Sequence, residues 1–101
     1  MYINNIKIKK CVSFKSRLIG LMFKKNINYG LYFPNCNSIH TFFMCENIDV
    51  IMWNNDNIIL YYYKNLGKNK IILPKKGVKN IYELPKNSIN DLKINDILKS
   101  T

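Results

Sequence analysis

The sequence contains no alanine and no glutamine, and it has only one arginine, one histidine and one tryptophan. Acidic residues are also scarce, since six Asp and Glu stand against sixteen Lys and Arg and give a formal net charge of +10. No apolar run reaches the ~18 residues of a membrane-spanning helix. Residues 1–14 alternate charge and Ile, unlike the apolar centre of a signal peptide. We therefore expect no transmembrane segment, no export signal and a cytoplasmic location.

The abundant residues predict a folded protein. Ile, Asn and Lys account for 47 of the 101 residues, while 48% of the chain is hydrophobic and 13% is aromatic. A disordered chain lacks this apolar content, so a packed core is expected. The length suits a single domain covering residues 1–101. With three Cys and no export signal, disulfide bonds are not expected.

Much of the positive charge follows from a bias in composition. The abundant residues Ile, Asn, Lys, Tyr and Phe share AT-rich codons, whereas the scarce residues have GC-rich codons. A high pI is normally a first sign of nucleic-acid binding. Here the bias accounts for the Lys excess, and we do not expect a nucleic-acid partner. The single Arg17 runs against the bias, which indicates a need for its planar, bidentate guanidinium group.

The stretch from Asn26 to Tyr63 contains no Lys or Arg. It carries nine of the thirteen aromatic residues, two of the three Cys, His40 and three of the six acidic residues. We interpret this stretch as the core and the site, and the Lys-rich flanks as its solvated coat.

Short apolar segments bounded by turn residues predict a mainly β fold. The expected strands are Tyr2–Lys10, Gly30–Phe33, Ile39–Met44, Asp49–Trp53, Asn57–Tyr63, Lys70–Leu73, Lys79–Leu84 and Ile94–Lys99. The turn Asn54-Asn55-Asp56 predicts a hairpin. Short helices are expected at Ser13–Lys25 and Ser88–Leu92, each N-capped by its Ser. The expected architecture is a small antiparallel open barrel or sandwich with one or two short helices.

Several strings occur in the order found in a known family. Residues 17–23 read RLIGLMF, residues 30–33 GLYF, residues 36–44 CNSIHTFFM and residues 48–52 IDVIM. Residues 78–85 and 94–96 add weaker matches. Together they span residues 13–99 and resemble the domain-of-unknown-function 192 family. The resemblance implies a compact, mostly β fold with short helices but no mechanism, because the biochemical function of that family is unestablished.

The chain departs from the family pattern at three positions. Cys45 stands where the family usually has Arg or Lys, and Asn87 and Asn95 stand where it usually has Gly. Asn tolerates the left-handed backbone, so both turns are expected to survive. The missing cation at position 45 weakens any role of that position in anion binding. Members of the family are often exported or lipid-anchored.

We predict a polar pocket around five residues: Arg17, His40, Thr41, Asp49 and Glu83. Arg17 would bind an anionic group or form an ion pair with Asp49 or Glu83. His40 and Thr41 would donate or accept hydrogen bonds, and the two acids would orient cations. A set of apolar residues would either form the core or line the apolar part of this pocket: Met22, Phe33, Phe43, Met44, Met52 and Trp53.

A second hypothesis is a metal- or thiol-dependent hydrolase that uses Cys36 and His40. Cys36, His40, Cys45 and Asp49 are also residue types that bind zinc, but their spacing is not the short C-x₂-C of structural sites. On a straight strand, Cys45 would point away from His40. We therefore expect no bound metal and no cofactor. We favour a small non-enzymatic binding or accessory domain whose partner is a small anionic ligand or a protein.

Overall fold

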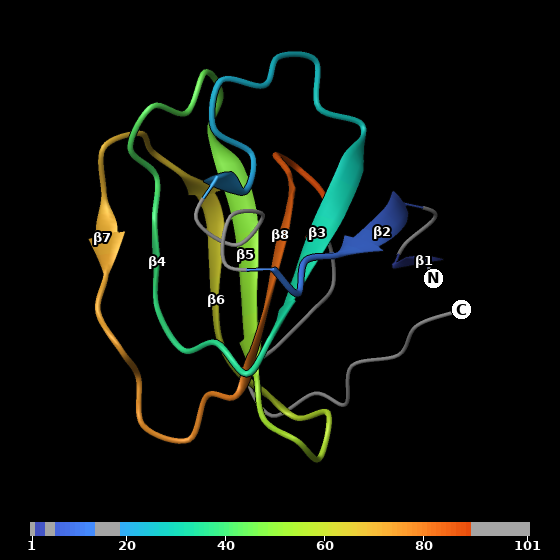
Figure 1. Ribbon diagram of the computed structural model, residues 1–101, viewed down its shortest axis with the longest axis vertical. Coiled ribbons are helices and arrows are strands. Elements are labelled where there is room, and N and C mark those ends of the chain that lie inside the picture. The colour runs from blue at the N-terminus through green and yellow to red at the C-terminus, as the bar shows by residue number, and fades with distance from the viewer. Residues whose placement is uncertain (1, 4–5, 14–18, 90–101) are drawn as a thin grey trace.

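The computed structural model describes residues 2–3, 6–13 and 19–89, which form a mainly β structure (Figure 1). In these ranges the strands are β1 (Tyr2–Ile3), β2 (Ile6–Lys10), β3 (Tyr29–Pro34), β4 (Ile39–His40), β5 (Ile48–Trp53), β6 (Ile59–Leu66), β7 (Ile71–Ile72) and β8 (Asn80–Pro85). Six of them form one sheet in the order β1-β2-β3-β8-β5-β6, and β4 and β7 form a small second sheet. Among the described residues β1 and β6 are its unpaired edges, so the large sheet does not close into a barrel.

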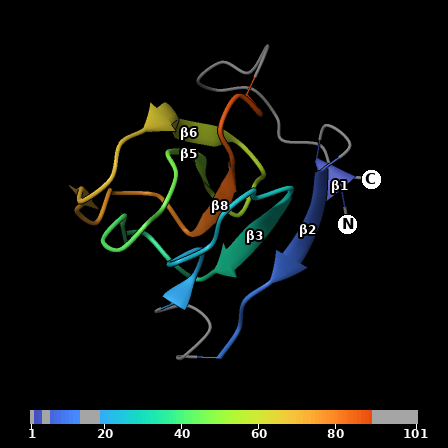
Figure 2. The same cartoon turned by 90° about the horizontal axis from the view of Figure 1, so that it is seen from above.

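The large sheet is mixed. β2 and β3 run parallel, whereas every other pair of neighbouring strands in it is antiparallel. Seen from above, the strands follow one another along a curved arc (Figure 2). β8 is the last strand of the described chain, yet it lies between β3 and β5. This late insertion places Asn80–Pro85 in the middle of the sheet.

The central strands are buried on both faces. All six residues of β5 are buried, and so are five of the six residues of β8. Residues directly opposite each other in an antiparallel pair point to the same face. Val50 pairs with Glu83, whereas Asp49 pairs with Leu84, so the two acids point to opposite faces. Each face packs its own core, and Glu83 lies on the face that carries Leu31, Phe33, Val50, Met52 and Ile81.

The second face carries an aromatic and aliphatic core of its own. It is formed by Ile8, Ile51, Trp53, Ile59, Tyr82, Leu84 and Ile89. The rings of Tyr32, Trp53 and Tyr82 contact one another with centroid distances of 5.3–5.5 Å. Aromatic and β-branched residues pack well on a pleated surface, which explains the abundance of Ile and Tyr in these strands.

The mainly β fold predicted from the sequence is confirmed, and so is the hairpin at 49–63, which is formed by β5 and β6. Two details differ. The β2–β3 pair is parallel, where an antiparallel arrangement was expected. The strand expected at Ile39–Met44 ends at His40, because Phe43 has a left-handed backbone (φ 62°) that a strand does not allow.

Of the helix expected at Ser13–Lys25, the described residues include only Ile19 as helix. Residues 20–23 form a turn after it, where Gly20 (φ 50°) and Phe23 (φ 63°) have left-handed backbone angles that a helix does not allow. Residues 14–18 lie outside the described residues, as do 90–101, where the strand at 94–99 and most of the helix at 88–92 were expected. In the described part of the chain, no helix is long and apolar enough to cross a membrane.

Gly30 of β3 lies where the second core leaves no room for a side chain. An added Cβ would lie 2.6 Å from Leu84 Cδ2 and 2.7 Å from Ile8 Cδ1, both in the second core. We predict that Gly30→Ala lowers the free energy of unfolding by about 1–3 kcal/mol, measured by urea denaturation. The control is Gly67→Ala, whose Cβ would meet its nearest atom, Lys70 Cε, at 3.8 Å. Equal urea midpoints for the two variants would contradict this packing.

Candidate functional site

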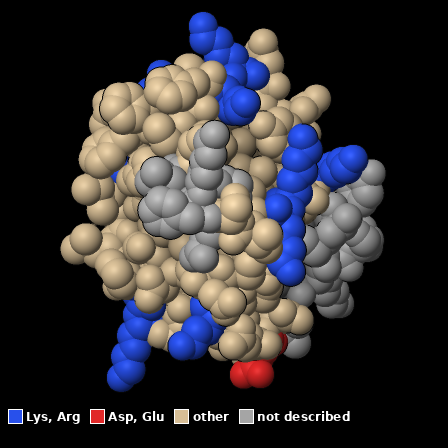
Figure 3. Space-filling view, in the orientation of Figure 1, with Lys and Arg blue, Asp and Glu red and all other residues tan. Residues whose placement is uncertain are grey.

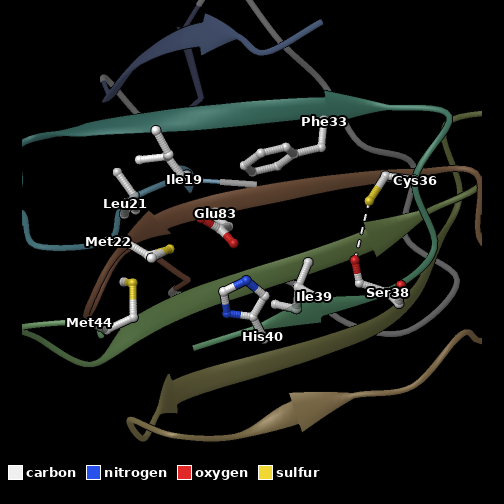
Figure 4. A pocket seen from close by; sticks show the side chains of 11 residues that line it. Ile19, Leu21, Met22, Phe33, Cys36, Ser38, Ile39, His40, Met44 and Glu83 are labelled. Atoms are coloured by element: carbon white, nitrogen blue, oxygen red, sulfur yellow. Dashed lines mark hydrogen bonds between the residues drawn. The ribbon is translucent and has the colours of Figure 1, made fainter. Parts of the chain in front are cut away.

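A cavity of about 100 Å³ opens on the Glu83 face of the sheet. Its walls come from β3, β8, β4 and the loops on either side of β4, together with the turn at 19–22 (Figure 4). The lining residues are Ile19, Gly20, Leu21, Met22, Phe33, Cys36, Ser38, Ile39, His40, Met44 and Glu83. Most of this lining is apolar, so the few polar groups determine which ligand would fit.

Glu83 is the most unusual of these polar groups. Its side chain is only 5% exposed, and its Oε1 has no hydrogen-bond partner. Burial raises the pKa of Glu83 to about 8, although a hydrogen bond from the backbone N–H of Leu21 partly opposes the rise in pKa. At neutral pH the carboxyl is therefore largely protonated. The Leu21 N–H goes to the other oxygen, so the unused Oε1 can donate its proton while the acid is neutral and accept a hydrogen bond once the acid is ionised.

Gly20 brings the backbone close to this carboxyl. Its φ of +50° is a left-handed angle that residues with a side chain rarely adopt. An added Cβ would lie 3.1 Å from Glu83 Oε1 and 3.5 Å from Phe33 Cζ. The absence of a side chain at position 20 therefore allows the turn to pass over Glu83 and lets Leu21 donate its backbone N–H.

His40 supplies the second polar group of the cavity. It lies on β4, opposite Ile71 of β7, and its ring is turned toward the same space as the Glu83 carboxyl (Figure 4). His40 Nδ1 accepts a hydrogen bond from the backbone N–H of Phe42 at 3.3 Å. In the neutral ring the proton therefore belongs to Nε2, which is a donor. The cavity thus offers an acid and a hydrogen-bond donor to one ligand.

Sulfur atoms line much of the remaining wall. The side chains of Met22 and Met44 point into the cavity from two loops, and Cys36 lies at the far end (Figure 4). The Cys36 thiol donates a hydrogen bond to the carbonyl oxygen of Ser38 at 3.2 Å. Flexible thioethers fill irregular gaps and adapt to different occupants, so this wall suits a small apolar group.

The structure brings together two of the five residues predicted for the pocket, His40 and Glu83. Arg17 lies outside the described residues. Thr41 is buried beside the cavity but does not line it. Its hydroxyl donates to the carbonyl of Gly67 at 2.8 Å and accepts the N–H of Lys70 at 2.7 Å, so it attaches the β6–β7 connection to the end of β4.

Asp49 does not belong to the predicted pocket. Its side chain points to the face of the sheet opposite the one that carries Glu83 and the cavity. Its Oδ1 accepts the N–H of Asn65 at 2.8 Å, and its Oδ2 accepts those of Ser88 and Ile89 at 2.7 and 2.9 Å. Three backbone donors occupy this carboxylate. Asp49 therefore fixes the end of β6 and the turn after β8 to β5, and it is not available to orient a ligand in the cavity.

The residues of the hydrolase hypothesis lie only partly together. Cys36 and His40 share the cavity, but each already has another hydrogen-bond partner, the Ser38 carbonyl and the Phe42 N–H. Where the chain is described, no three His, Cys, Asp or Glu side chains converge to hold a metal ion. The structure therefore does not show the nucleophile–base contact that this hypothesis requires.

The apolar residues singled out in the sequence divide into three groups. Met22, Phe33 and Met44 line the cavity, Met52 and Trp53 are buried in the two cores, and Phe43 is exposed. Sequence reasoning missed the lining residues Ile19, Ser38 and Ile39. Gly20 was visible in the sequence as part of the string RLIGLMF at residues 17–23.

We predict that Glu83→Gln removes a pH dependence of stability. Between pH 4.5 and 8 the folded state keeps the Glu83 proton that the unfolded state releases, so its stability falls as the pH rises. The slope in this window is about 1.4 kcal/mol per pH unit at most. Urea unfolding at pH 5 and pH 8 should show this loss in the natural protein and no such loss in the variant. A natural protein equally stable at both pH values would contradict the buried acid.

We also predict that Asp49→Asn destabilises the fold without altering the cavity. The amide replaces one acceptor oxygen by an NH₂ group that faces backbone donors. The expected cost is about 2–4 kcal/mol in free energy of unfolding. Asp56→Asn is the matched control, because Asp56 is exposed in the β5–β6 turn and should change stability by less than about 0.5 kcal/mol. Equal effects of the two substitutions would disprove the role assigned to Asp49.

Solved structures of similar fold come from two bacteria. A candidate transcription regulator from Sinorhizobium meliloti 1021 superimposes with a TM-score of 0.78 at 16% identity, over 91% of this chain and 79% of that one. A protein of unknown function from Novosphingobium aromaticivorans DSM 12444 gives a TM-score of 0.71 at 13% identity, over 81% of this chain and 64% of that one. At these identities the likeness concerns the fold alone.

Relatives at higher identity come from Thermococcus. A UPF0127 protein of Thermococcus kodakarensis is 35% identical over 96 residues, which cover 89% of this chain and 60% of that protein. A UPF0127 protein of Thermococcus sibiricus is 35% identical over 85 residues, which cover 78% of this chain and 54% of that protein. The chain thus spans somewhat more than half the length of these relatives.

The motifs noted in the sequence lie within a family match that covers nearly the whole chain. The model of the family, described as "Uncharacterized ACR", matches residues 2–97. This match contains the cavity residues from Ile19 to Glu83. The chain therefore belongs to the domain-of-unknown-function 192 family.

Proposed function

We propose that the protein binds a small organic ligand that donates a hydrogen bond to Glu83, best a small ammonium ion. The observation that carries the proposal is the Oε1 atom of Glu83, which is buried, has no partner and faces the cavity. An unmade hydrogen bond at a buried polar atom costs about 1–3 kcal/mol. A ligand that supplies the missing donor recovers this cost, and a cation also favours the ionised carboxyl.

The size of the cavity limits the ligand. An engineered apolar cavity of 150 Å³ binds benzene, so a cavity of about 100 Å³ accepts about four or five non-hydrogen atoms. The apolar wall of Ile19, Phe33 and Ile39 would contact the hydrocarbon part, while the ammonium head would lie against the carboxyl of Glu83. A short branched or linear alkylamine meets these requirements.

This proposal differs from the anionic ligand expected from the sequence. That expectation depended on Arg17, which lies outside the described residues. The described lining of the cavity contains a carboxyl group and no Lys or Arg. An anion placed beside Glu83 would be repelled once the carboxyl ionises, whereas a cation is attracted to the ionised carboxylate.

Binding of isobutylammonium at several pH values tests the proposal. This probe has five non-hydrogen atoms, and like other alkylamines it stays protonated up to about pH 10. Because the pKa of Glu83 is about 8, the affinity should rise close to tenfold per pH unit from pH 6 to pH 8 and level off above. Calorimetry or chemical-shift titration of the full chain measures this profile.

Two control variants distinguish the contribution of the Glu83 carboxyl to binding from that of the cavity as a whole. Glu83→Gln should weaken isobutylammonium binding at pH 8.5 at least tenfold and flatten the pH profile. Glu46→Gln should leave both unchanged, because Glu46 lies outside the cavity and accepts the backbone N–H groups of Asn26 and Ile27. Equal, pH-independent binding of isobutylammonium and neutral isobutanol would show an apolar void without a polar specificity, and would overturn the proposal.

A further inference from the structure

A strip of exposed apolar side chains runs along the loops that close the cavity. We call it the apolar strip, and it consists of Phe23, Phe42, Phe43, Ile71 and Leu73. Three of these side chains are more than 60% exposed: Phe23 at 67%, Phe43 at 63% and Leu73 at 69%. Single exposed apolar residues are common, but five on one continuous surface indicate an interaction site.

Stacking, hydrogen bonding and strand pairing join the members of the strip to one another. Phe23 and Phe43 stack with ring centroids 5.6 Å apart, and the N–H of Phe23 donates to the carbonyl of Phe43 at 3.0 Å. Phe42 follows along the strip, since its ring stacks on His40 at 5.4 Å, and His40 pairs with Ile71 across β4 and β7. Ser38–His40, Phe42 and residues 71–74 together enclose a shallow apolar groove, so the strip is continuous.

The two stacked phenylalanines are held outward by an unfavourable backbone. Phe23 has φ 63° and Phe43 has φ 62°, left-handed angles that are rare for bulky residues. Such angles cost of order 1–3 kcal/mol each and persist where the surroundings or a function require them. Their chain neighbours Met22 and Met44 point into the cavity. The strained turns thus place thioethers inside and aromatic rings in solvent.

Lysines accompany the strip along the chain. Lys24 and Lys25 follow Phe23, and Lys68 and Lys70 precede Ile71, all four with exposed side chains. Of the four described acids, Asp49 and Glu83 are buried, Asp56 lies in the distant β5–β6 turn, and Glu46 is bonded to two backbone N–H groups. Figure 3 shows a broad uncharged surface with basic groups around it and an acidic group only at the lower edge.

We propose that the apolar strip docks on an anionic lipid bilayer, with the rings of Phe23 and Phe43 inserted among the headgroups and the lysines beside them contacting the lipid charges. Exposed aromatic and aliphatic side chains with flanking Lys fit the boundary between acyl chains and anionic headgroups. The charge distribution favours an anionic membrane as the partner, because positive charge next to apolar rings complements a negatively charged lipid interface. The proposal is independent of any ligand in the cavity.

Sedimentation with lipid vesicles tests the proposal on the full chain. The vesicles contain phosphatidylcholine alone or with 30% phosphatidylglycerol. We expect binding to the anionic vesicles that falls with added salt, and weak binding to the zwitterionic ones. Phe23→Ser with Phe43→Ser should reduce binding at least tenfold, and Leu73→Ser alone should reduce it severalfold. Because Leu73 is on a different loop, it keeps the test valid if the double variant fails to fold.

Matched control variants distinguish binding by the apolar strip from binding by the net charge or by any exposed apolar side chain. Val12→Ser removes a side chain that is 65% exposed and that does not belong to the strip, so it should leave binding unchanged. Lys68→Gln with Lys70→Gln should weaken binding about 25-fold, at about fivefold per charge. Lys7→Gln with Lys9→Gln should have little effect on binding, because β2 lies on the opposite side of the molecule from β7, which carries Ile71 of the strip (Figure 1).

Three outcomes would overturn the proposal. One is equal binding of the natural protein and the Leu73→Ser variant to anionic vesicles. Another is an equal loss on neutralising either lysine pair, which would indicate nonspecific attraction by the net charge. The third is concentration-dependent self-association without vesicle binding, abolished by Leu73→Ser, which would assign the strip to a second copy of this chain.

Discussion

The burial of one carboxyl group, that of Glu83, is the constraint around which the described structure is organised. β8 inserts between β3 and β5, so Glu83 lies in the middle of a sheet whose central strands are buried on both faces. Ionising a carboxyl there is costly, and the pKa of Glu83 accordingly rises to about 8. A structure that retains such a group keeps an unsatisfied acceptor at the wall of a cavity, where a ligand can reach it.

The local backbone around this acid is unusual in ways that serve the cavity. Gly20 passes close enough for Leu21 to donate its N–H to the carboxyl, and a Cβ at Gly20 would lie 3.1 Å from Glu83 Oε1. Phe23 and Phe43 adopt left-handed angles beside two residues that line the cavity, Met22 and Met44. Asp49 performs a different task on the other face, where it joins three backbone N–H groups. One acid is thus satisfied and structural, and the other has a free oxygen.

The sequence predicted the elements whose signals are local. It did not predict the features that depend on contacts between segments far apart in the chain. The β5–β6 hairpin was visible because Asn54-Asn55-Asp56 separates two apolar segments. The helix expected at Ser13–Lys25 was predicted to extend too far, since the spacing of Leu21 and Met22 fits a helical face while the left-handed angles of Gly20 and Phe23 form a turn after Ile19. His40 and Glu83 were both named as site residues and line one cavity. Asp49 was placed with them because nothing local shows that β5 turns it to the opposite face.

The most direct test of this account is a carbon-13 titration of the Glu83 side-chain carboxyl, assigned by comparison with Glu83→Gln. We predict a midpoint near pH 8 in the free protein. Addition of isobutylammonium should move the midpoint to lower pH, because a bound cation favours the ionised form. A midpoint near the usual 4.5, unmoved by the amine, would show that the carboxyl is solvated and would contradict both the buried acid and the ligand site.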